Sequence, residues 1–157
     1  MTDVKLTLTG EEKLALQHSK IKLKEVHMCK AVDLAEKLDI SIDRAERLIS
    51  SAYFQQIPGV GPSFARNITD LGFTKLEQLE PYKGPELLNR LEKLYECQID
   101  PCVEDMLWQI TYYARTRDLK KQWYDFTSKR KTYRNENGYP KDRPKRKGCK
   151  HVQRRAD

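Results

Sequence analysis

The chain has 157 residues, of which 34% are charged and 38% are hydrophobic. This length supports one hydrophobic core of ordinary size or two very small ones. The mean hydropathy is −0.81, and no apolar run approaches the roughly 18 residues of a membrane-spanning helix. The N-terminus also lacks the basic and apolar regions of a secretion signal. We therefore expect a cytoplasmic protein with no membrane partner.

Positive charge gathers at the C-terminal end. The formal net charge is +7, yet residues 129–157 alone hold 12 Lys and Arg against 3 Asp and Glu. Blocks of like charge are usually solvated arms, and such arms commonly bind nucleic acid. We therefore expect a helical domain over 1–126 and a basic, largely flexible C-terminal arm over 127–157, the alternative being a solubilising tail without a partner. The candidate contacts of this arm are Lys129, Arg130, Lys131, Arg134, Lys145, Arg146 and Lys147.

The first part of the chain carries local signals for short helices. Thr9 followed by Glu12 is the pattern of a capping box, and it predicts a helix that ends at about His18. The spacing of apolar residues over 32–38 predicts a second short helix. These signals favour an all-α protein from the start of the chain.

A third helix over 43–55, capped by Ser41 or Asp43, leads into the most informative stretch of the chain. There a short turn reads Pro58-Gly59-Val60-Gly61, and Pro62 suits the first position of a new helix. Two glycines one residue apart allow positive φ angles and a close approach of another backbone. The pattern predicts two helices joined by a tight turn.

This turn resembles the helix-hairpin-helix motif, a sequence-independent phosphate-binding element of many DNA repair and recombination proteins. The resemblance implies that N–H groups of the turn and of the following first helical turn face a phosphate oxygen, where the helix dipole is positive. The DNA phosphate-binding residues that it implies are Gly59, Val60, Gly61, Ser63, Phe64 and Arg66. The alternative is a hairpin that serves only to pack two helices together.

Part of this pattern recurs along the chain. At an offset of 20 residues, Ile40, Ala45 and Leu48 fall on Val60, Ala65 and Ile68. A third version begins at Leu76 and continues through Gly84-Pro85. Either the body is a tandem of hairpin-like units, in which only Gly59–Gly61 keeps a phosphate-competent turn, or Leu-rich helices resemble one another by chance.

Asp100-Pro101 marks a further helix start, with Asp as the N-cap and Pro as the first helical residue. The predicted helix carries two stripes, Val103-Leu107-Ile110-Ala114 and Trp108-Tyr112-Arg115. The aromatic residues Trp123, Tyr124 and Phe126 either cover the second stripe or stack on bases of single-stranded nucleic acid. Of these two interpretations we expect packing.

No catalytic residue, metal site or cofactor is expected. DNA glycosylases resemble this hairpin but place a catalytic Asp where this chain has Pro81, and Asp100 is explained by its capping role. The candidate ligands Cys97, Cys102, Cys149 and His151 do not match the paired spacing of a structural zinc site. Without a secretion signal, the cysteines are expected to be reduced thiols.

Several short strings also resemble one family. They are Leu34-Ala35-Glu36, Phe54-Gln55-Gln56-Ile57-Pro58-Gly59-Val60-Gly61, Leu71-Gly72-Phe73, Glu86-Leu87-Leu88, Asp100-Pro101-Cys102-Val103-Glu104-Asp105 and Trp123-Tyr124-Asp125-Phe126. Over roughly residues 5–144, the chain resembles small bacterial helix-hairpin-helix proteins known as the pathogenicity-locus family. The family's label reflects genomic position, so the resemblance implies a helical DNA-binding type of protein and gives no reaction.

Together these signals predict an all-α fold, a compact bundle of about five to seven short helices built on tandem helix-hairpin-helix-like units and followed by a basic C-terminal arm. The expected function is sequence-independent binding of DNA through the hairpin and the arm, and the motif implies a link to repair or recombination. The alternative is a protein–protein adaptor whose hairpin is only a packing element. The expected partner is thus the DNA backbone or another protein, and no enzymatic activity is expected.

Overall fold

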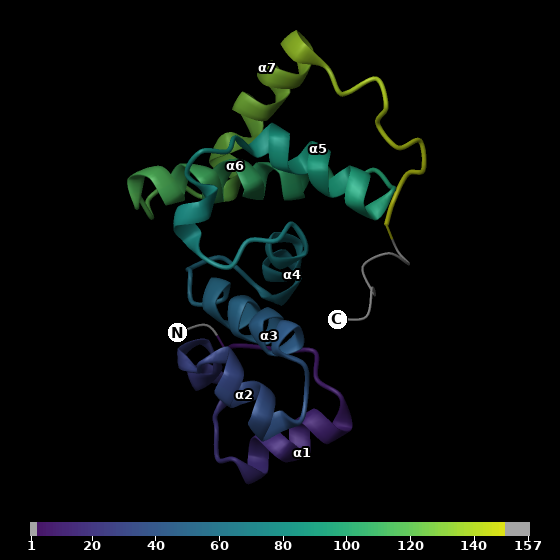
Figure 1. Ribbon diagram of the computed structural model, residues 1–157. Helices are drawn as coiled ribbons and strands as arrows, with labels where there is room; N and C mark the ends of the chain where they lie inside the picture. The colour runs from purple at the N-terminus through teal and green to yellow at the C-terminus, as the bar shows by residue number, and fades with distance from the viewer. Residues whose placement is uncertain (1–2, 150–157) are drawn as a thin grey trace. The chain divides into compact units, whose positions relative to one another are not determined.

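The computed structural model describes residues 3–149, which form an all-α chain (Figure 1). These residues hold seven α-helices, three 3₁₀-helices and no strand, so the expected fold class is confirmed. The described chain divides into two units, the first ending at Lys75 and the second beginning at Leu76. The change in charge along the chain predicts a boundary at 126 instead, whereas the two units follow the packing within each core. No described helix is long and apolar enough to cross a membrane.

The first unit contains five helices whose starts follow the local signals. They are α1 (Gly10–His18), η1 (Leu23–Met28), α2 (Ala31–Leu38), α3 (Ile42–Phe54) and α4 (Pro62–Asp70). The capping box of α1 is confirmed, because Thr9 Oγ1 accepts the N–H of Glu12 at 3.1 Å and Glu12 Oε1 accepts the N–H of Thr9 at 2.9 Å. Ser41, rather than Asp43, caps α3, since its Oγ accepts the N–H of Arg44 at 3.0 Å.

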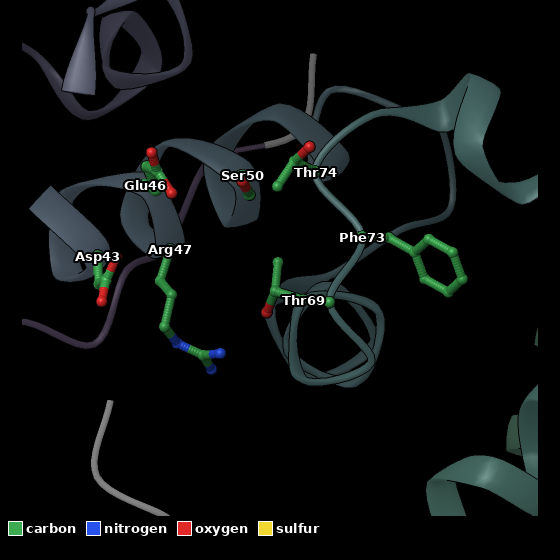
Figure 2. A pocket seen from close by; sticks show the side chains of 8 residues that line it. Asp43, Glu46, Arg47, Ser50, Thr69, Phe73 and Thr74 are labelled. Atoms are coloured by element: carbon green, nitrogen blue, oxygen red, sulfur yellow. The ribbon is translucent and has the colours of Figure 1, made fainter.

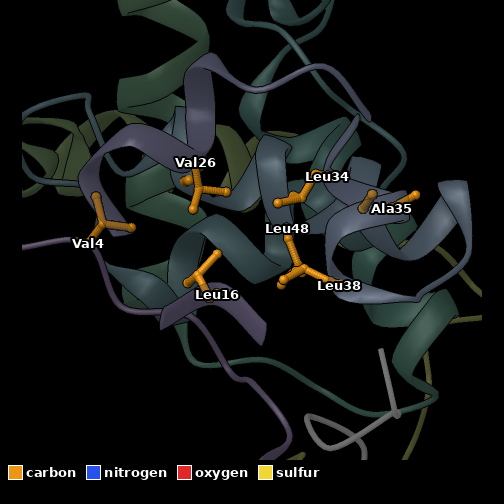
Figure 3. Packing of buried hydrophobic residues seen from close by; sticks show 9 residues of the cluster. Val4, Leu16, Val26, Leu34, Ala35, Leu38 and Leu48 are labelled. Atoms are coloured by element: carbon orange, nitrogen blue, oxygen red, sulfur yellow. The ribbon is translucent and has the colours of Figure 1, made fainter. Parts of the chain in front are cut away.

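Apolar side chains of the N-terminal segment and of α1, η1, α2 and α3 form a buried cluster (Figure 3). Its members are Val4, Leu16, Val26, Leu34, Ala35, Leu38, Ala45, Leu48 and Ala52. The cluster-facing side of α3 carries small residues, and Ala45 and Ala52 are fully buried. Small residues let helices approach closely, and both α2 and η1 pack against α3. Each of these short helices is therefore stabilised mainly by packing.

Glu12 and Arg44 form an ion pair in the first unit. Arg44 Nε and Nη2 donate to the two carboxylate oxygens of Glu12, each at 3.0 Å. These hydrogen bonds, followed by those from Thr9, lower the pKa of Glu12 below its usual value, against an opposing effect of burial. A carboxyl whose folded-state pKa is lowered adds stability above its unfolded pKa and loses that contribution as pH falls.

We therefore expect Glu12→Gln to destabilise the protein at neutral pH and to have a smaller effect below about pH 4. Urea denaturation followed by circular dichroism at a series of pH values measures the difference between wild type and variant. Glu11→Gln, which removes an exposed carboxylate from the same helical turn, is the matched control. Parallel pH profiles for the two variants would contradict the expected role of the Glu12–Arg44 pair.

The second unit is built around α5 (Gly84–Tyr95) and α6 (Pro101–Thr116), which lie side by side (Figure 1). Its elements are η2 (Leu76–Leu79), α5 (Gly84–Tyr95), α6 (Pro101–Thr116), η3 (Trp123–Phe126) and α7 (Thr127–Asn137). The start of α5 lies so close to α6 that a Cβ at Gly84 would lie 2.8 Å from Trp108 Cα, so only glycine fits there without a shift. Asp100 caps α6 as expected, since its Oδ1 accepts the N–H of Cys102 at 2.8 Å.

The aromatic residues of η3 divide between the core and the surface. Phe126 is buried and packs on Tyr112 of α6, with 5.5 Å between the ring centroids. Trp123 and Tyr124, in contrast, are 38% and 59% exposed. The expected packing over the stripe of Trp108, Tyr112 and Arg115 is therefore confirmed for Phe126. It is wrong for Trp123 and Tyr124. Tyr133 of α7 instead packs edge-on against Trp108.

Residues 127–149, called the C-terminal segment below, are folded, in contrast to the flexible arm that the charge pattern predicts. Buried carboxylates of α5 and α6 each bind one arginine of this segment, in the pairs Glu104–Arg134, Asp105–Arg130 and Glu92–Arg143. All three carboxylate residues are at most 1% exposed. A charge at this depth is strongly destabilising without a partner, so the pairs hold the C-terminal segment against α5 and α6.

A stacked tyrosine joins two of these pairs. The guanidinium carbons of Arg134 and Arg143 lie 4.1 and 3.6 Å from the centroid of the Tyr139 ring. Arg is well suited to such a site, because its planar cation can stack on an aromatic face and bind a carboxylate at once. The segment thus folds through charge and stacking although its apolar content is low. The part of the expected arm over 150–157 lies outside the described residues.

Cys97, which follows α5, forms a disulfide with Cys149 at the end of the C-terminal segment. The expectation of reduced thiols is therefore wrong for these two residues, while Cys29 and Cys102 are free. The backbone of Gln98 supports the link, because its N–H donates to Arg146 O at 2.7 Å and its carbonyl accepts the N–H of Gly148 at 3.1 Å. A sequence separation of 52 residues explains why the spacing of the cysteines did not indicate this pairing.

Candidate functional site

A tight turn over residues 55–61, the hairpin turn, joins α3 to α4 in the first unit. Gln55 at its start is 1% exposed. The Gln55 side chain bonds the backbone of Lys5 twice, with Oε1 accepting the N–H at 2.9 Å and Nε2 donating to the carbonyl at 2.8 Å. Within the turn, the N–H of Val60 donates to Ile57 O at 3.0 Å. The hairpin turn is therefore fixed by hydrogen bonds at its start and within the loop.

The two glycines of the hairpin turn have different roles. Gly59 has φ +87°, a conformation that side chains other than glycine rarely adopt. Gly61, the N-cap of α4, has φ −90° and ψ −178°, which any residue can adopt. In the described part of the chain, no heavy atom beyond Gly61 and its two neighbours in sequence lies within 4 Å of a Cβ built at Gly61. Glycine is thus required by the backbone at 59, whereas at 61 it leaves open space at the start of α4.

The start of α4 presents unused hydrogen-bond donors. Pro62 has no N–H, and the N–H groups of Gly61, Ser63 and Phe64 have no acceptor among residues 3–149. The N–H of Ala65 is the first to join the helical pattern, donating to Gly61 O at 3.0 Å. No side chain caps this helix, and its first turn contains no acidic residue. The positive end of the helix dipole is therefore open to an anion.

Three other helices begin differently. Thr9, Ser41 and Asp100 cap α1, α3 and α6 with side-chain oxygens. The first turns of these helices also contain acidic residues, whose carboxylates oppose the approach of an anion. Among these four helices, only α4 combines an uncapped start with an uncharged first turn.

The residues predicted to bind phosphate are brought together, but they do not all offer a contact. The side chains of Val60 and Phe64 are 2% and 3% exposed, so they anchor the hairpin turn in the unit. The N–H of Val60 is also occupied by Ile57, which leaves Val60 a packing role. Ser63 is exposed, and Arg66 Nη2 donates to Thr7 Oγ1 at 3.2 Å.

The predicted arm residues fall into two groups. Lys129, Lys131, Lys145, Arg146 and Lys147 are exposed. Arg130 and Arg134 instead bind Asp105 and Glu104, and Arg134 is only 8% exposed. These two arginines therefore stabilise the second unit, and the interpretation of them as exposed DNA contacts is corrected.

Sequence reasoning missed the acidic partners of these arginines. One signal was available on α6, where Glu104 lies three residues before Leu107 and seven before Thr111, on the stripe that proves to be buried. Burial raises the pKa of Glu104, while the charge and hydrogen bonds of Arg134 act against that shift. A carboxylate in the register of a buried stripe indicates a buried ion pair, because it needs a cation to remain there.

A shallow pocket of about 240 Å³ lies beside α3 and the end of α4 (Figure 2). Arg47, which lines it, binds Asp70. Figure 2 shows the Phe73 ring turned away from the other labelled side chains. The hydroxyl of Thr69 donates to Arg66 O at 3.0 Å within α4. Arg47 and Thr69 of this pocket thus serve the local structure, and Asp43 and Glu46 would oppose an anion, so we do not place the candidate site there.

The residues weighed as zinc ligands do not form a metal site in the described chain. Cys97 and Cys149 are bonded to each other, and His151 lies outside the described residues. Within residues 3–149, no three His, Cys, Asp or Glu side chains are grouped so that they could hold a metal ion.

Comparisons with known proteins identify a family. Neither a curated protein nor a solved structure matches the chain. One family model, described as Pathogenicity locus, matches residues 49–132, which is more than half of the chain. The matched region begins within α3, includes the hairpin turn and the open start of α4, and ends within α7. The matched region is shorter than residues 5–144, over which the sequence resembles this family. It still contains the strings over 54–61, 100–105 and 123–126. The chain therefore belongs to the pathogenicity-locus family.

Proposed function

We propose that this protein binds DNA without regard to sequence, and that the start of α4 holds a backbone phosphate. One observation carries the proposal: the N–H groups of Gly61, Ser63 and Phe64 have no acceptor in the described chain, at a helix start that has no side-chain cap and no acidic residue. A phosphate oxygen accepts such donors, and the helix dipole favours its charge. Contacts of this kind position a protein on DNA without reading the bases.

The exposed cations of the C-terminal segment would supply most of the affinity. Lys129, Lys131, Lys145, Arg146 and Lys147 are exposed, and binding of such groups to phosphates releases counterions. If about five phosphates are neutralised, the logarithm of the binding constant should fall with the logarithm of salt concentration with a slope of about −4 to −5. The hairpin turn itself contains no charged residue, so its contribution should depend less on salt.

The variant Gly61→Glu tests the proposed phosphate site. Because Gly61 has ordinary backbone angles and open space at its Cβ, the substitution adds a carboxylate without requiring a change of fold. We expect affinity for a short duplex, measured by fluorescence anisotropy, to fall about tenfold or more, since a hydrogen bond to a charged group contributes about 1.5–3 kcal/mol. Substitution of Gly59 is less suitable, because its positive φ would strain any other residue.

Two controls separate charge at the site from other effects. Gly61→Ala changes the side chain without adding charge and should bind DNA almost as the wild type does. Gly10→Glu adds the same charge to α1, at a position that also has open space in the described chain. Unchanged affinity of Gly61→Glu, or an equal loss in Gly10→Glu, would sink the proposal for the hairpin turn.

The contribution of the C-terminal segment is best tested by neutralising charges. Removal of the segment would leave Glu92, Glu104 and Asp105 buried without their arginines, so a truncated chain would report on folding as well as on binding. The triple variant Lys145→Gln, Arg146→Gln and Lys147→Gln keeps those pairs intact. We expect its affinity to fall and its salt slope to be smaller in magnitude by about 2–3. A slope equal to that of the wild type would exclude these residues as phosphate contacts.

A protein–protein adaptor is the second candidate function. Leu14, Met28 and Val32 of the first unit are 58%, 68% and 62% exposed, which favours contact with an apolar partner surface. In that case the hairpin turn would only pack α3 and α4 together. The burial of Val60 and Phe64 is consistent with this role. The Gly61→Glu variant distinguishes the two functions, because an adaptor of this kind predicts no change in DNA affinity.

A further inference from the structure

Two large aromatic side chains of the second unit point to a binding site outside the hairpin turn. Trp123 and Tyr124 are 38% and 59% exposed, although they belong to a short helix that is anchored in the core. The anchor is Phe126, which is 2% exposed and packs on Tyr112. The chain thus buries one ring of η3 and leaves two others in solvent.

The two exposed rings are held in place before any ligand binds. They meet edge to face, with 5.6 Å between centroids and an interplanar angle of 78°. Asp125 Oδ2 accepts the N–H of Gln122 at 2.8 Å at the start of η3, and Gln109 Nε2 donates to Lys121 O at 3.3 Å. A surface that is already ordered loses little conformational entropy on binding.

Lysines flank this aromatic surface. Lys121 Nζ lies 5.8 Å from the ring centroid of Tyr112, and Lys129 Nζ lies 5.5 Å from that of Phe126. Because those two rings pack on each other, the two ammonium groups lie close to η3. Within residues 3–149, neither these two lysines nor the exposed Lys120 forms an ion pair with a carboxylate.

The nearby acidic side chains are bound to donors of the protein. Asp118 Oδ2 accepts the hydroxyl of Tyr112 at 2.8 Å, and its Oδ1 accepts the N–H of Lys120 at 2.9 Å. Asp125 caps η3. These hydrogen bonds lower the pKa of Asp118, so its negative charge persists. Lys120, Lys121 and Lys129 outnumber the two carboxylates of Asp118 and Asp125, so the surface keeps a net positive charge beside its aromatic faces.

This combination selects one class of ligand. Lysines beside exposed rings suit a polyanion that also carries flat apolar groups, which describes a nucleic acid. The bases of a duplex stack on one another, so only unpaired bases are accessible to a protein ring. We propose that Trp123 and Tyr124 stack on unpaired bases of single-stranded nucleic acid, while Lys120, Lys121 and Lys129 bind the adjacent phosphates. The site goes beyond the proposed function, because it requires no contact from the hairpin turn.

The double variant Trp123→Ala/Tyr124→Ala tests this site in the full-length protein. Because stacking contributes about 1–3 kcal/mol per base, its affinity for a short fluorescein-labelled oligothymidylate should fall at least about tenfold. Its affinity for a short duplex should stay within about twofold of the wild-type value. Leu119→Ala, which removes an apolar side chain that is 47% exposed in the same segment, is the matched control and should bind both ligands normally.

A second measurement uses the wild-type protein and therefore does not depend on how the variants fold. A single strand of abasic sites keeps the phosphates but lacks the bases, so it should bind at least about tenfold more weakly than oligothymidylate of the same length. Equal binding of the abasic strand, or an equal loss for single strand and duplex in the double variant, would overturn the stacking site. Binding of an acidic peptide with the same affinity as the oligothymidylate would also overturn it, because charge alone would then explain the surface. The test of the stacking site is independent of the hairpin turn. If Gly61→Glu left duplex binding unchanged, the proposal for Trp123 and Tyr124 would still stand or fall on the single-strand measurements.

Discussion

Replacing Arg134 with leucine is expected to lower the free energy of unfolding by about 3–5 kcal/mol, the cost of leaving a buried charge without its partner. Arg134 Nε donates to both carboxylate oxygens of Glu104, at 3.2 and 3.0 Å. Its Nη2 donates to Asn89 Oδ1 at 3.0 Å, and its Nη1 donates to Gly138 O at 3.1 Å. Leucine removes all of these bonds at once, while Glu104 remains fully buried.

The penalty for losing Arg134 is expected to increase with pH. Burial already raises the pKa of Glu104, and Arg134 limits that shift, so the variant should hold the carboxyl at a still higher pKa. A carboxyl whose folded-state pKa lies above its unfolded value loses stability as pH rises above the unfolded value. The destabilisation should therefore be smallest at and below about pH 4 and larger at neutral pH.

Urea denaturation followed by tryptophan fluorescence measures this effect, because Trp108 Nε1 lies 3.4 Å from Glu104 Oε2. Lys131→Leu, on the exposed side of α7, is the control and should change stability by less than about 0.5 kcal/mol. The double variant Glu104→Leu/Arg134→Leu should recover much of the loss, since it leaves no unpaired charge. If Arg134→Leu cost no more than the control, the pair would not hold the C-terminal segment in place.

Breaking the disulfide between Cys97 and Cys149 is expected to produce the second large effect. The bond links residues that are 52 positions apart, and closing a loop of this length removes about 4 kcal/mol of conformational entropy from the unfolded chain. Cys149→Ser should lower the melting temperature and should expose the end of the C-terminal segment to proteases. The buried ion pairs should keep α7 folded in this variant, because Arg130 and Arg134 precede the released end.

Thiol titration of the denatured protein provides a direct test of the disulfide. Two thiols, those of Cys29 and Cys102, are expected before reduction, because the other two cysteines are bonded. Four are expected after reduction. Cys102→Ser, which removes an exposed thiol, is the control for the loss of a cysteine and should leave the melting temperature almost unchanged. Four thiols before reduction would contradict the link.

The sequence by itself predicted the elements whose signals are local. The capping pattern of Thr9 and Glu12, the Asp100-Pro101 start and the glycines of the hairpin turn are all visible within a few residues, because caps and turns depend on neighbouring backbone groups. The same reasoning predicted an all-α protein of the pathogenicity-locus family. It also singled out the start of α4, where the structure places backbone N–H groups without an acceptor in the described chain.

Only the tertiary structure decided which basic residues of the C-terminal segment form buried ion pairs and which are exposed to solvent. Net charge describes 129–157 as a block, but charge does not reveal which cations have buried partners. Glu92, Glu104 and Asp105 lie 25 to 51 residues from the arginines that they bind, and only the packing of α5 against α6 places these carboxylates inside. Water can no longer solvate these carboxylates once they are buried. Arg130, Arg134 and Arg143 must therefore compensate their negative charges. Local sequence determined where helices begin and end. The burial of carboxylates far away in the sequence determined which cations of the C-terminal segment are bound inside the protein and which stay exposed.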